Sequence, residues 1–228
     1  MRVYFIRHGQ SENNALWQRT GSSRGRSEDA GLTGLGRRQA EIVARFLRDA
    51  DPAEFGIAHL YTSLMVRAIA TGTIIAEALG LPLVAWPDLH ETGGIYWEDE
   101  QTEVRTGLAG KDRAYFEREY PRLVLPDTLG AAGWWNRPFE EREERPIRAR
   151  RVWRELLARH GQPDDRVVVI AHGGFYNYLL AALLDMPTVD GHWFVLHNAA
   201  ITRLDFQSDG VGLVYLNRAD FLPPELIT

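Results

Sequence analysis

The residues best suited to catalysis follow two apolar stretches of the chain. Arg7 and His8 come directly after the run at 3–6, and His172 follows the run at 166–171. A neutral imidazole can attack phosphorus as a nucleophile, and an arginine presents a planar fork of donors that matches phosphate oxygens. Flanking arginines also favour the neutral ring over the imidazolium ion. These residue types indicate chemistry on a phosphate-like anion.

Two more charged residues stand close to predicted elements. Arg67 lies one turn into a helix that follows the run at 57–61, and helix N-termini favour anions. Glu91 follows the run at 83–86 in a glycine-rich loop, where a carboxylic acid can protonate a leaving group. Gly173 and Gly174 open another helix, and we expect their amides to donate to an oxyanion.

Each of these residues also has a purely structural explanation. The motif around His8 can be a chance tripeptide at a strand end, and Arg67 can be a surface residue with a buried stem. His172 can be a buried histidine whose N–H is satisfied inside the core, and Glu91 a solvated loop residue. Residue types alone leave both sets of explanations open.

The elements that position these residues alternate between strand and helix. Strands are predicted at 3–6, 57–61, 83–86, 166–171, 192–196, 200–206 and 211–216, and helices at 33–50, 64–79, 111–120, 140–159 and 175–184. Thr33 and Ser63 are predicted N-caps, and 19–31 a mobile loop. The pattern predicts an α/β, three-layer sandwich with a mostly parallel central sheet and helices on both faces. Ligands bind beyond the carboxyl ends of such strands, so His8 and His172 are expected to meet there.

An aromatic-rich insert at about 95–150 interrupts this alternation within a single predicted domain, 1–228. Five of the seven tryptophans lie between residues 86 and 153. We interpret the insert as a helical lid that packs Trp134 and Trp135 on the core. The alternative is a specificity cap in which Tyr96, Trp97 or these tryptophans line an apolar pocket for the leaving group.

Composition excludes several classes of protein. The 228 residues carry 26 Lys and Arg against 31 Asp and Glu, a net charge of −5 that disfavours general nucleic-acid binding. Cysteine is absent, which excludes disulfides, a thiolate nucleophile and Cys-ligated metals. Since no apolar stretch approaches the roughly 20 residues of a membrane span, we expect a cytoplasmic protein without a membrane partner. The sequence leaves a homodimer open.

Five ordered motifs resemble the histidine phosphatase superfamily, also called phosphoglycerate mutase-like. They are residues 7–14 (RHGQSENN), 32–40 (LTGLGRRQA), 61–68 (YTSLMVRA), 171–174 (AHGG) and 198–202 (NAAIT). Together they span most of the chain, and only the insert has no clear counterpart. The resemblance implies a metal-independent enzyme without a cofactor, acting on a small phosphorylated substrate.

The resemblance also implies a role for individual residues. His8 would be the nucleophile that becomes phosphohistidine, and Glu91 the acid that protonates the leaving group and then the base for water. A bound phosphate would keep Glu91 protonated, because like charges disfavour ionisation. The phosphate pocket would consist of Arg7, Arg67 and His172, and the further substrate contacts would be Gln10, Asn14 and Gly173.

Two departures from the family pattern favour a phosphatase over a mutase. Mutases of this family carry Glu-Arg-x-Tyr-Gly around the acid, whereas residues 90–96 read HETGGIY without the arginine. Their Phe-x-Gly-Trp-x-Asp element is also absent, and residues 19–23 read RTGSS. The prediction is a phosphomonoester hydrolase, with a phosphoglycerate mutase-type phosphotransferase or a non-catalytic phospho-ligand module as alternatives. A metallohydrolase is disfavoured, because no two histidines have the His-x-x-x-His spacing and an arginine beside His8 repels cations.

Overall fold

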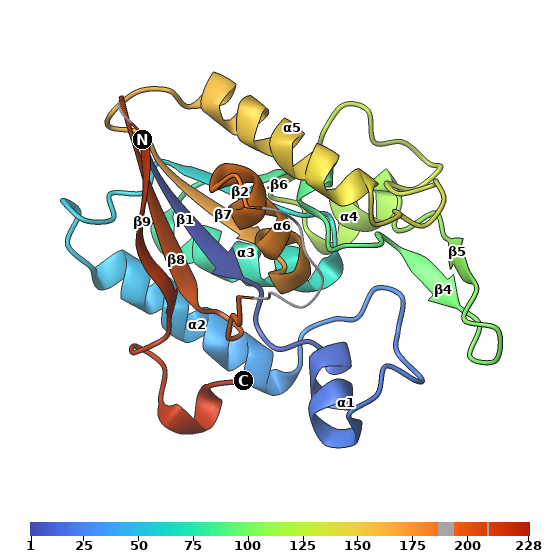
Figure 1. Ribbon diagram of the computed structural model, residues 1–228. Helices are drawn as coiled ribbons and strands as arrows, with labels where there is room; N and C mark the ends of the chain where they lie inside the picture. Colours follow the sequence, from blue (N-terminus) through green and yellow to red (C-terminus); the bar gives the residue numbers. More distant parts are fainter. Residues whose placement is uncertain (187–193, 209) are drawn as a thin grey trace.

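A seven-stranded sheet forms the centre of the computed structural model, which describes residues 1–186, 194–208 and 210–228 (Figure 1). The strand order is β6-β3-β2-β7-β1-β8-β9, parallel from β6 to β1 and antiparallel at β8 and β9. The strands are β1 (Arg2–Arg7), β2 (His59–Thr62), β3 (Leu83–Ala85), β6 (Leu123–Val124), β7 (Arg166–Ala171), β8 (Ile201–Gln207) and β9 (Gly210–Arg218). A separate hairpin pairs β4 (Tyr96–Glu98) with β5 (Arg105–Gly107). The predicted α/β class is confirmed.

Helices cover both faces of this sheet. The helices are α1 (Glu12–Thr20), α2 (Gly34–Asp49), α3 (Val66–Leu79), α4 (Arg113–Glu119), α5 (Glu144–Arg159) and α6 (Gly173–Leu183), with short 3-10 turns at Pro87–Leu89 and Pro224–Leu226. Alternate residues of β1 point to opposite faces: Val3 and Phe5 pack in the core under α5 and α6, and Tyr4 and Ile6 in the core under α2 and α3. Figure 1 shows α5 and α2 on opposite sides of the strands.

The register of the parallel strands aligns their carboxyl ends. Arg7 pairs with Ala171 across β1 and β7, and Thr62 pairs with Ile170 across β2 and β7. The next residue of each chain segment therefore enters the same region beyond the sheet. This arrangement is the one expected for a ligand site in an open α/β sheet.

Several local predictions were wrong. No helix was predicted at α1, whose last two residues overlap the loop predicted at 19–31. The helix begins where Ser11 and Asn14 form a reciprocal capping box. Ser63 is not the N-cap of α3, because Met65 holds that position. Of the strand predicted at 192–196, the first two residues lie outside the described part, and 194–196 are not a strand; the N–H of Phe194 donates to Asn177 Oδ1 instead.

The insert at 95–150 is integrated into the domain. Its strand β6 extends the central sheet beside β3, and its last residues begin α5. Trp135 is buried with Met65 and Ile95, whereas Trp97 on the hairpin is 47% exposed. Trp135 packs in this small cluster with Trp134 partly buried beside it, and the role of the insert as a lid stays a prediction. Among the described residues, none of the helices is both long and apolar enough to cross a bilayer.

Candidate active site

His8 lies in the turn after β1 and is 2% exposed. Its Nδ1 is 2.7 Å from the carbonyl oxygen of Gly9, and a carbonyl only accepts, so Nδ1 carries the ring hydrogen. The lone pair is therefore on Nε2, which accepts from Arg67 Nε at 3.1 Å. Burial, followed by the charges of Arg67 and Arg7, holds the pKa of His8 well below its usual value. The ring is neutral and its nucleophilic nitrogen is defined.

Two half-buried arginines flank His8. Arg67 is in the first turn of α3, and Arg7 closes β1, where its Nη1 donates to the carbonyl of Leu196. The Nε of Arg7 is buried and lacks a hydrogen-bond partner among the described residues. Burial lowers the pKa of both arginines, but a guanidinium stays charged at any physiological pH. The site therefore concentrates positive charge and holds an unused donor.

His172 faces His8 with ring centroids 5.1 Å apart. Its Nε2 is 2.7 Å from the hydroxyl of Ser63, and that hydroxyl also accepts from the Met65 amide at 3.0 Å. A serine hydroxyl can accept two hydrogen bonds and donate one, so Ser63 holds Nε2 of His172 in either tautomer of the ring. Nδ1 is buried without a partner in the described structure, and burial holds the pKa of His172 well below its usual value. Ser63 was the predicted helix cap, and its contact with His172 was missed.

Glu91 reaches the N-terminus of α6. Its carboxylate accepts from the amides of Thr92 at 2.8 Å, Gly174 at 3.1 Å and Phe175 at 2.8 Å. Its charge also acts on both Arg7 and Arg67. The side chain is neither a solvated loop residue nor remote from the histidines. Of the two amides expected to bind an oxyanion, that of Gly174 binds this carboxylate instead, together with the Phe175 amide that was not predicted.

Glycines in the two motifs make room for close backbone contacts. A Cβ on Gly9 would lie 2.4 Å from the carbonyl oxygen of Gly36 in α2, and a Cβ on Gly174 would lie 2.5 Å from Glu91 Oε1. Gly9 is therefore needed for the close approach of its backbone to Gly36 in α2. Gly173 lies beside Arg7, 3.4 Å from its Nε by the same construction.

The predicted substrate contacts fall into different surroundings. Asn14 Oδ1 caps α1 and accepts from Asn198 Nδ2 at 3.2 Å, so its carbonyl oxygen is engaged and its amide nitrogen carries the predicted donor. Gln10 is buried, donates to Gln18 at 3.1 Å and accepts from Thr33 at 2.8 Å. Both ends of the Gln10 amide are occupied within the protein, which indicates a structural task.

Three supporting residues were not anticipated. Asn198 Nδ2 donates to the His8 carbonyl at 2.9 Å, and Thr71 Oγ1 accepts from the Gly9 amide at 3.0 Å. Asp29 accepts from the Val66 amide at 3.0 Å at the start of α3, and burial raises its pKa to about 6 against the opposing charge of Arg67. The only sequence signal for them was their place within or near the quoted motifs.

A model of the histidine phosphatase superfamily (branch 1) matches residues 3–219. The chain belongs to the histidine phosphatase superfamily. A probable phosphoglycerate mutase, GpmB, of Yersinia enterocolitica is 29% identical over 207 residues, covering 91% of this chain and 86% of the relative.

Solved structures of the superfamily share the fold. A phosphoserine phosphatase of Entamoeba histolytica, crystallised with 3-phosphoglyceric acid, superposes with a TM-score of 0.65 at 21% identity over 97% of this chain and 99% of that one. A mycobacterial glucosyl-3-phosphoglycerate phosphatase with bound VO3 gives 0.61 at 24% identity, over 96% and 99%. At these identities the similarity establishes only that the chain shares this fold.

Proposed function

We propose that the protein is a phosphomonoester hydrolase that forms a phosphohistidine on Nε2 of His8. The observation that carries the proposal is the bond from Nδ1 of His8 to the Gly9 carbonyl, which fixes the lone pair on Nε2. A neutral imidazole held this way is ready to attack phosphorus without losing a proton first. The low pKa of His8 keeps it in that form across the neutral range.

The charges around His8 suit a phosphoryl group in transfer. Such a group spreads negative charge over three oxygens, and fixed cations and donors provide most of the stabilisation. Arg7 and Arg67 supply two cations, and His172, held at Nε2 by Ser63, supplies a neutral donor in the tautomer that carries its hydrogen on Nδ1. The arginines thereby carry the positive charge that a metal ion supplies in other phosphatases.

Glu91 is the proposed proton donor and acceptor. In the first step the bond from Nε2 to phosphorus forms, the ester P–O bond breaks, and Glu91 gives its proton to the leaving oxygen. In the second step Glu91 takes a proton from water, the oxygen attacks phosphorus, and the N–P bond breaks to release phosphate. The three amides hold the carboxylate in place, and the proton that Glu91 gives up in the first step is the one it regains from water in the second.

The substrate class is a small phosphorylated metabolite. Relatives and structural neighbours are named for phosphoglycerate, phosphoserine and glucosyl-3-phosphoglycerate, which supports that class without selecting a member. A mutase differs by its second step, because it returns the phosphoryl group to a bound acceptor rather than to water. The GpmB-type relatives make this the alternative to be tested.

The test is hydrolysis of para-nitrophenyl phosphate in excess EDTA by the wild type, His8→Ala and the matched control His59→Ala. We expect the wild type and the control to turn over and His8→Ala to lose at least about 10³-fold in kcat/KM. Acid-labile label from ³²P-substrate should be trapped on the wild type and on His59→Ala, and not on His8→Ala. Absence of wild-type hydrolysis, together with phosphate exchange between bisphosphoglycerate and monophosphoglycerate, would instead establish the mutase.

A further inference from the structure

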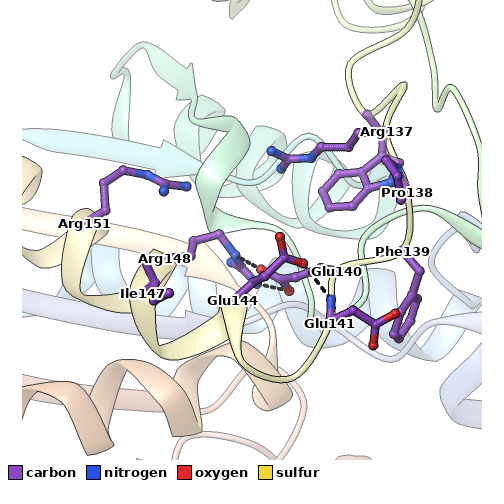
Figure 2. Close-up of a pocket in the computed structure, with 10 residues that line it drawn as sticks. Arg137, Pro138, Phe139, Glu140, Glu141, Glu144, Ile147, Arg148 and Arg151 are labelled. Carbon is purple, nitrogen blue, oxygen red and sulfur yellow. Dashed lines mark hydrogen bonds and ion pairs between the residues drawn. The ribbon is translucent and has the colours of Figure 1, made fainter.

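We propose that Glu140 and Arg148, a buried ion pair outside the phosphate pocket, form a clasp that positions Glu91 for proton transfer. The proposal deepens the proposed function and rests on it. Neither residue belongs to any of the motifs that carry the family resemblance. Both are almost fully buried, with Arg148 3% and Glu140 6% exposed. Figure 2 shows the two side chains joined by hydrogen bonds.

Arg148, on α5, divides its guanidinium donors between the loop that carries Glu91 and the carboxylate of Glu140. Its Nη1 donates to the carbonyls of Asp88 at 2.8 Å and His90 at 2.9 Å, immediately before Glu91. Its Nε and Nη2 donate to the two carboxylate oxygens of Glu140. A lysine cannot reproduce this pattern, because it is a point charge without a planar fork.

Glu140 fastens the other side of the same loop. Its Oε2 accepts from the Gly93 amide at 3.2 Å, and its own amide donates to the Gly93 carbonyl at 3.1 Å. The backbone is therefore held two residues after Glu91 as well as one residue before it. With the backbone held on both sides, the Glu91 side chain moves only by rotation about its own bonds.

The clasp also contacts the ring of Phe175, a residue whose backbone amide donates to Glu91. The guanidinium of Arg148 lies 3.8 Å from the ring centroid of Phe175, whose amide donates to Glu91. Buried ion pairs contribute little net stability, because desolvation offsets their attraction. A buried pair directed at both flanks of one catalytic side chain therefore points to positioning.

A positioning role for Glu91 predicts a dependence on the leaving group. Phenyl phosphate needs a proton on its leaving oxygen, whereas 2,4-dinitrophenolate leaves without one. We expect Arg148→Lys and Glu140→Gln to lower kcat/KM for phenyl phosphate by about 10- to 100-fold, the scale of a small misplacement. The same variants should change kcat/KM for 2,4-dinitrophenyl phosphate less than about threefold, because phosphoryl transfer to His8 then proceeds without the acid.

Two further variants calibrate the experiment. Glu91→Gln sets the size of the leaving-group effect when the acid itself is removed. Arg151→Gln is the matched control, since Arg151 is on the same helix and pairs with the Asp88 side chain at 2.8 Å, on the exposed rim of the loop. We expect Arg151→Gln to act alike on both substrates, within about twofold of the wild type.

The outcomes separate the two proposals. If Glu91→Gln slows both substrates equally, Glu91 is not the acid and that part of the proposed function fails. If Glu91→Gln discriminates between the substrates but Arg148→Lys and Glu140→Gln do not, the clasp is overturned. Equal losses on both substrates in the clasp variants, with a lowered Tm, would show a role in folding only and also overturn it.

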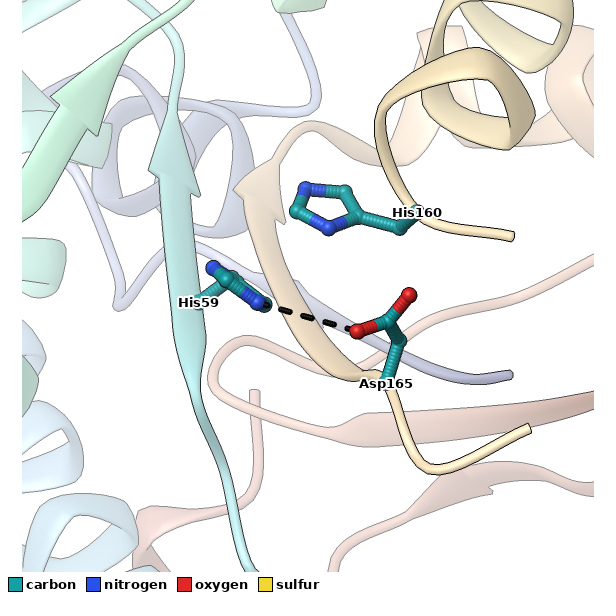
Figure 3. A group of neighbouring side chains, drawn as sticks. All are labelled: His59, His160 and Asp165. Atoms are coloured by element: carbon teal, nitrogen blue, oxygen red, sulfur yellow. Dashed lines mark ion pairs between the residues drawn. The ribbon is translucent and has the colours of Figure 1, made fainter. Parts of the chain in front are cut away.

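We propose separately that His59, His160 and Asp165 bind a divalent cation such as Zn²⁺ at the amino ends of the strands. One ligand atom of each lies within 4.8 Å of the others, and His59 Nε2 is 3.9 Å from Asp165 Oδ1 (Figure 3). Zinc bonds of about 2 Å place tetrahedral ligands roughly 3.3 Å apart, so the partly exposed His59 and Asp165 need to move inward by about 1 Å.

The surroundings already orient two of these ligands. The hydroxyl of Tyr61 lies 2.7 Å from His160 Nε2, and Figure 3 shows the other ring nitrogen of His160 facing His59 and Asp165. The Gln162 amide donates to Asp165 Oδ2 at 2.9 Å, which leaves Oδ1 for the cation. Such outer contacts fix the ring and carboxylate geometry of a metal ligand.

Titration with Co²⁺, followed by its visible absorption and by displacement with Zn²⁺, tests this site in tag-free protein. We expect one equivalent in the wild type and in His8→Ala, and at least about tenfold weaker binding in His59→Ala and Asp165→Asn. Binding that is lost in His8→Ala, or unchanged in the other two variants, would overturn the proposal.

Discussion

Two pairs of histidines lie near opposite ends of the parallel part of the central sheet. The active-site pair, His8 and His172, follows the carboxyl ends of β1 and β7, with ring centroids 5.1 Å apart. The remote pair, His59 and His160, lies where β2 and β7 begin, with centroids 4.2 Å apart. The rings are similarly close, but the charges that act on His8 are those of arginines, whereas both the Asp165 carboxylate and Arg159 act on His160.

The neighbouring charges assign opposite chemistry to the two pairs. Burial and arginine charge together hold the pKa of His8 well below its usual value, so its neighbourhood favours anions over protons. Burial also lowers the pKa of His160, but there the Asp165 carboxylate opposes the shift. The charged neighbours of a histidine pair therefore decide which ligand it favours. The active-site pair suits a phosphate, and the remote pair suits a cation.

The largest loss of activity is expected when an arginine beside the active-site pair is removed. In Arg67→Ala, we expect kcat/KM for para-nitrophenyl phosphate to fall by about 10²- to 10³-fold, the scale for losing one fixed electrostatic contact. The pKa of His8 should also rise, because the Arg67 charge lowers it in the wild type. The acid limb of the pH–rate profile should move to higher pH, and a limb that stays in place would contradict the electrostatic account.

Acid should destabilise the protein through its buried histidines. His8, His90 and His172 have pKa values well below 6.5 when folded, so below pH 6.5 the unfolded chain binds protons that the folded chain excludes. The free energy of unfolding should fall as pH drops below about 6.5, by up to about 1.4 kcal/mol per pH unit for each histidine. Asp29 acts oppositely between about 4 and 6, because its folded pKa is raised to about 6.

Urea unfolding at a series of pH values measures this dependence. The matched variant His172→Gln should show a shallower loss of stability below pH 6.5, since one of the excluded protons is gone. Asp29→Asn should show a steeper loss between about pH 4 and 6, because it removes the opposing group. Stability that is flat from pH 7.5 to 5 would show that the histidines titrate normally.

The active-site pair was predictable from the sequence because strands position it. The run at 166–171 is apolar at nearly every position, which is typical of a central strand buried on both faces. The motif after 3–6 ends a second such strand, and parallel register then brings both ends together. Helix α2 followed from its 3.6-residue periodicity and its Thr33 cap, and α3 from its terminal residues, to within a few residues.

The contacts between loops and side chains were not predictable in this way. The clasp joins residues 40 to 60 positions apart in the chain, and no periodicity encodes such a pairing. Helix α1 buries none of its residues, so it has no apolar stripe to detect; its signal was the Ser11–Asn14 capping box. The remote pair escaped notice because its ligands come from separate elements rather than one helix.

Ser63 distinguishes a helix cap from a catalytic support. A cap residue replaced by alanine costs roughly 1 kcal/mol of stability and leaves the chemistry alone. Because Ser63 holds Nε2 of His172, we expect Ser63→Ala to lower kcat/KM by about 10-fold, the scale of a hydrogen bond to a charged transition state. Thermal unfolding and kinetics of the same sample separate the two roles, and a lowered Tm with normal kinetics would restore the cap.

The smallest effect on activity is expected from a substitution beside the remote pair. Strand β7 has six residues and spans about 20 Å, roughly twice the distance over which salt screens exposed charges. The charge of Asp165 therefore has little influence on His8, and Asp165→Asn should leave kcat/KM in EDTA within about twofold of the wild type. A larger change would mean that the two ends of the sheet are coupled, and the comparison between independent histidine pairs would fail.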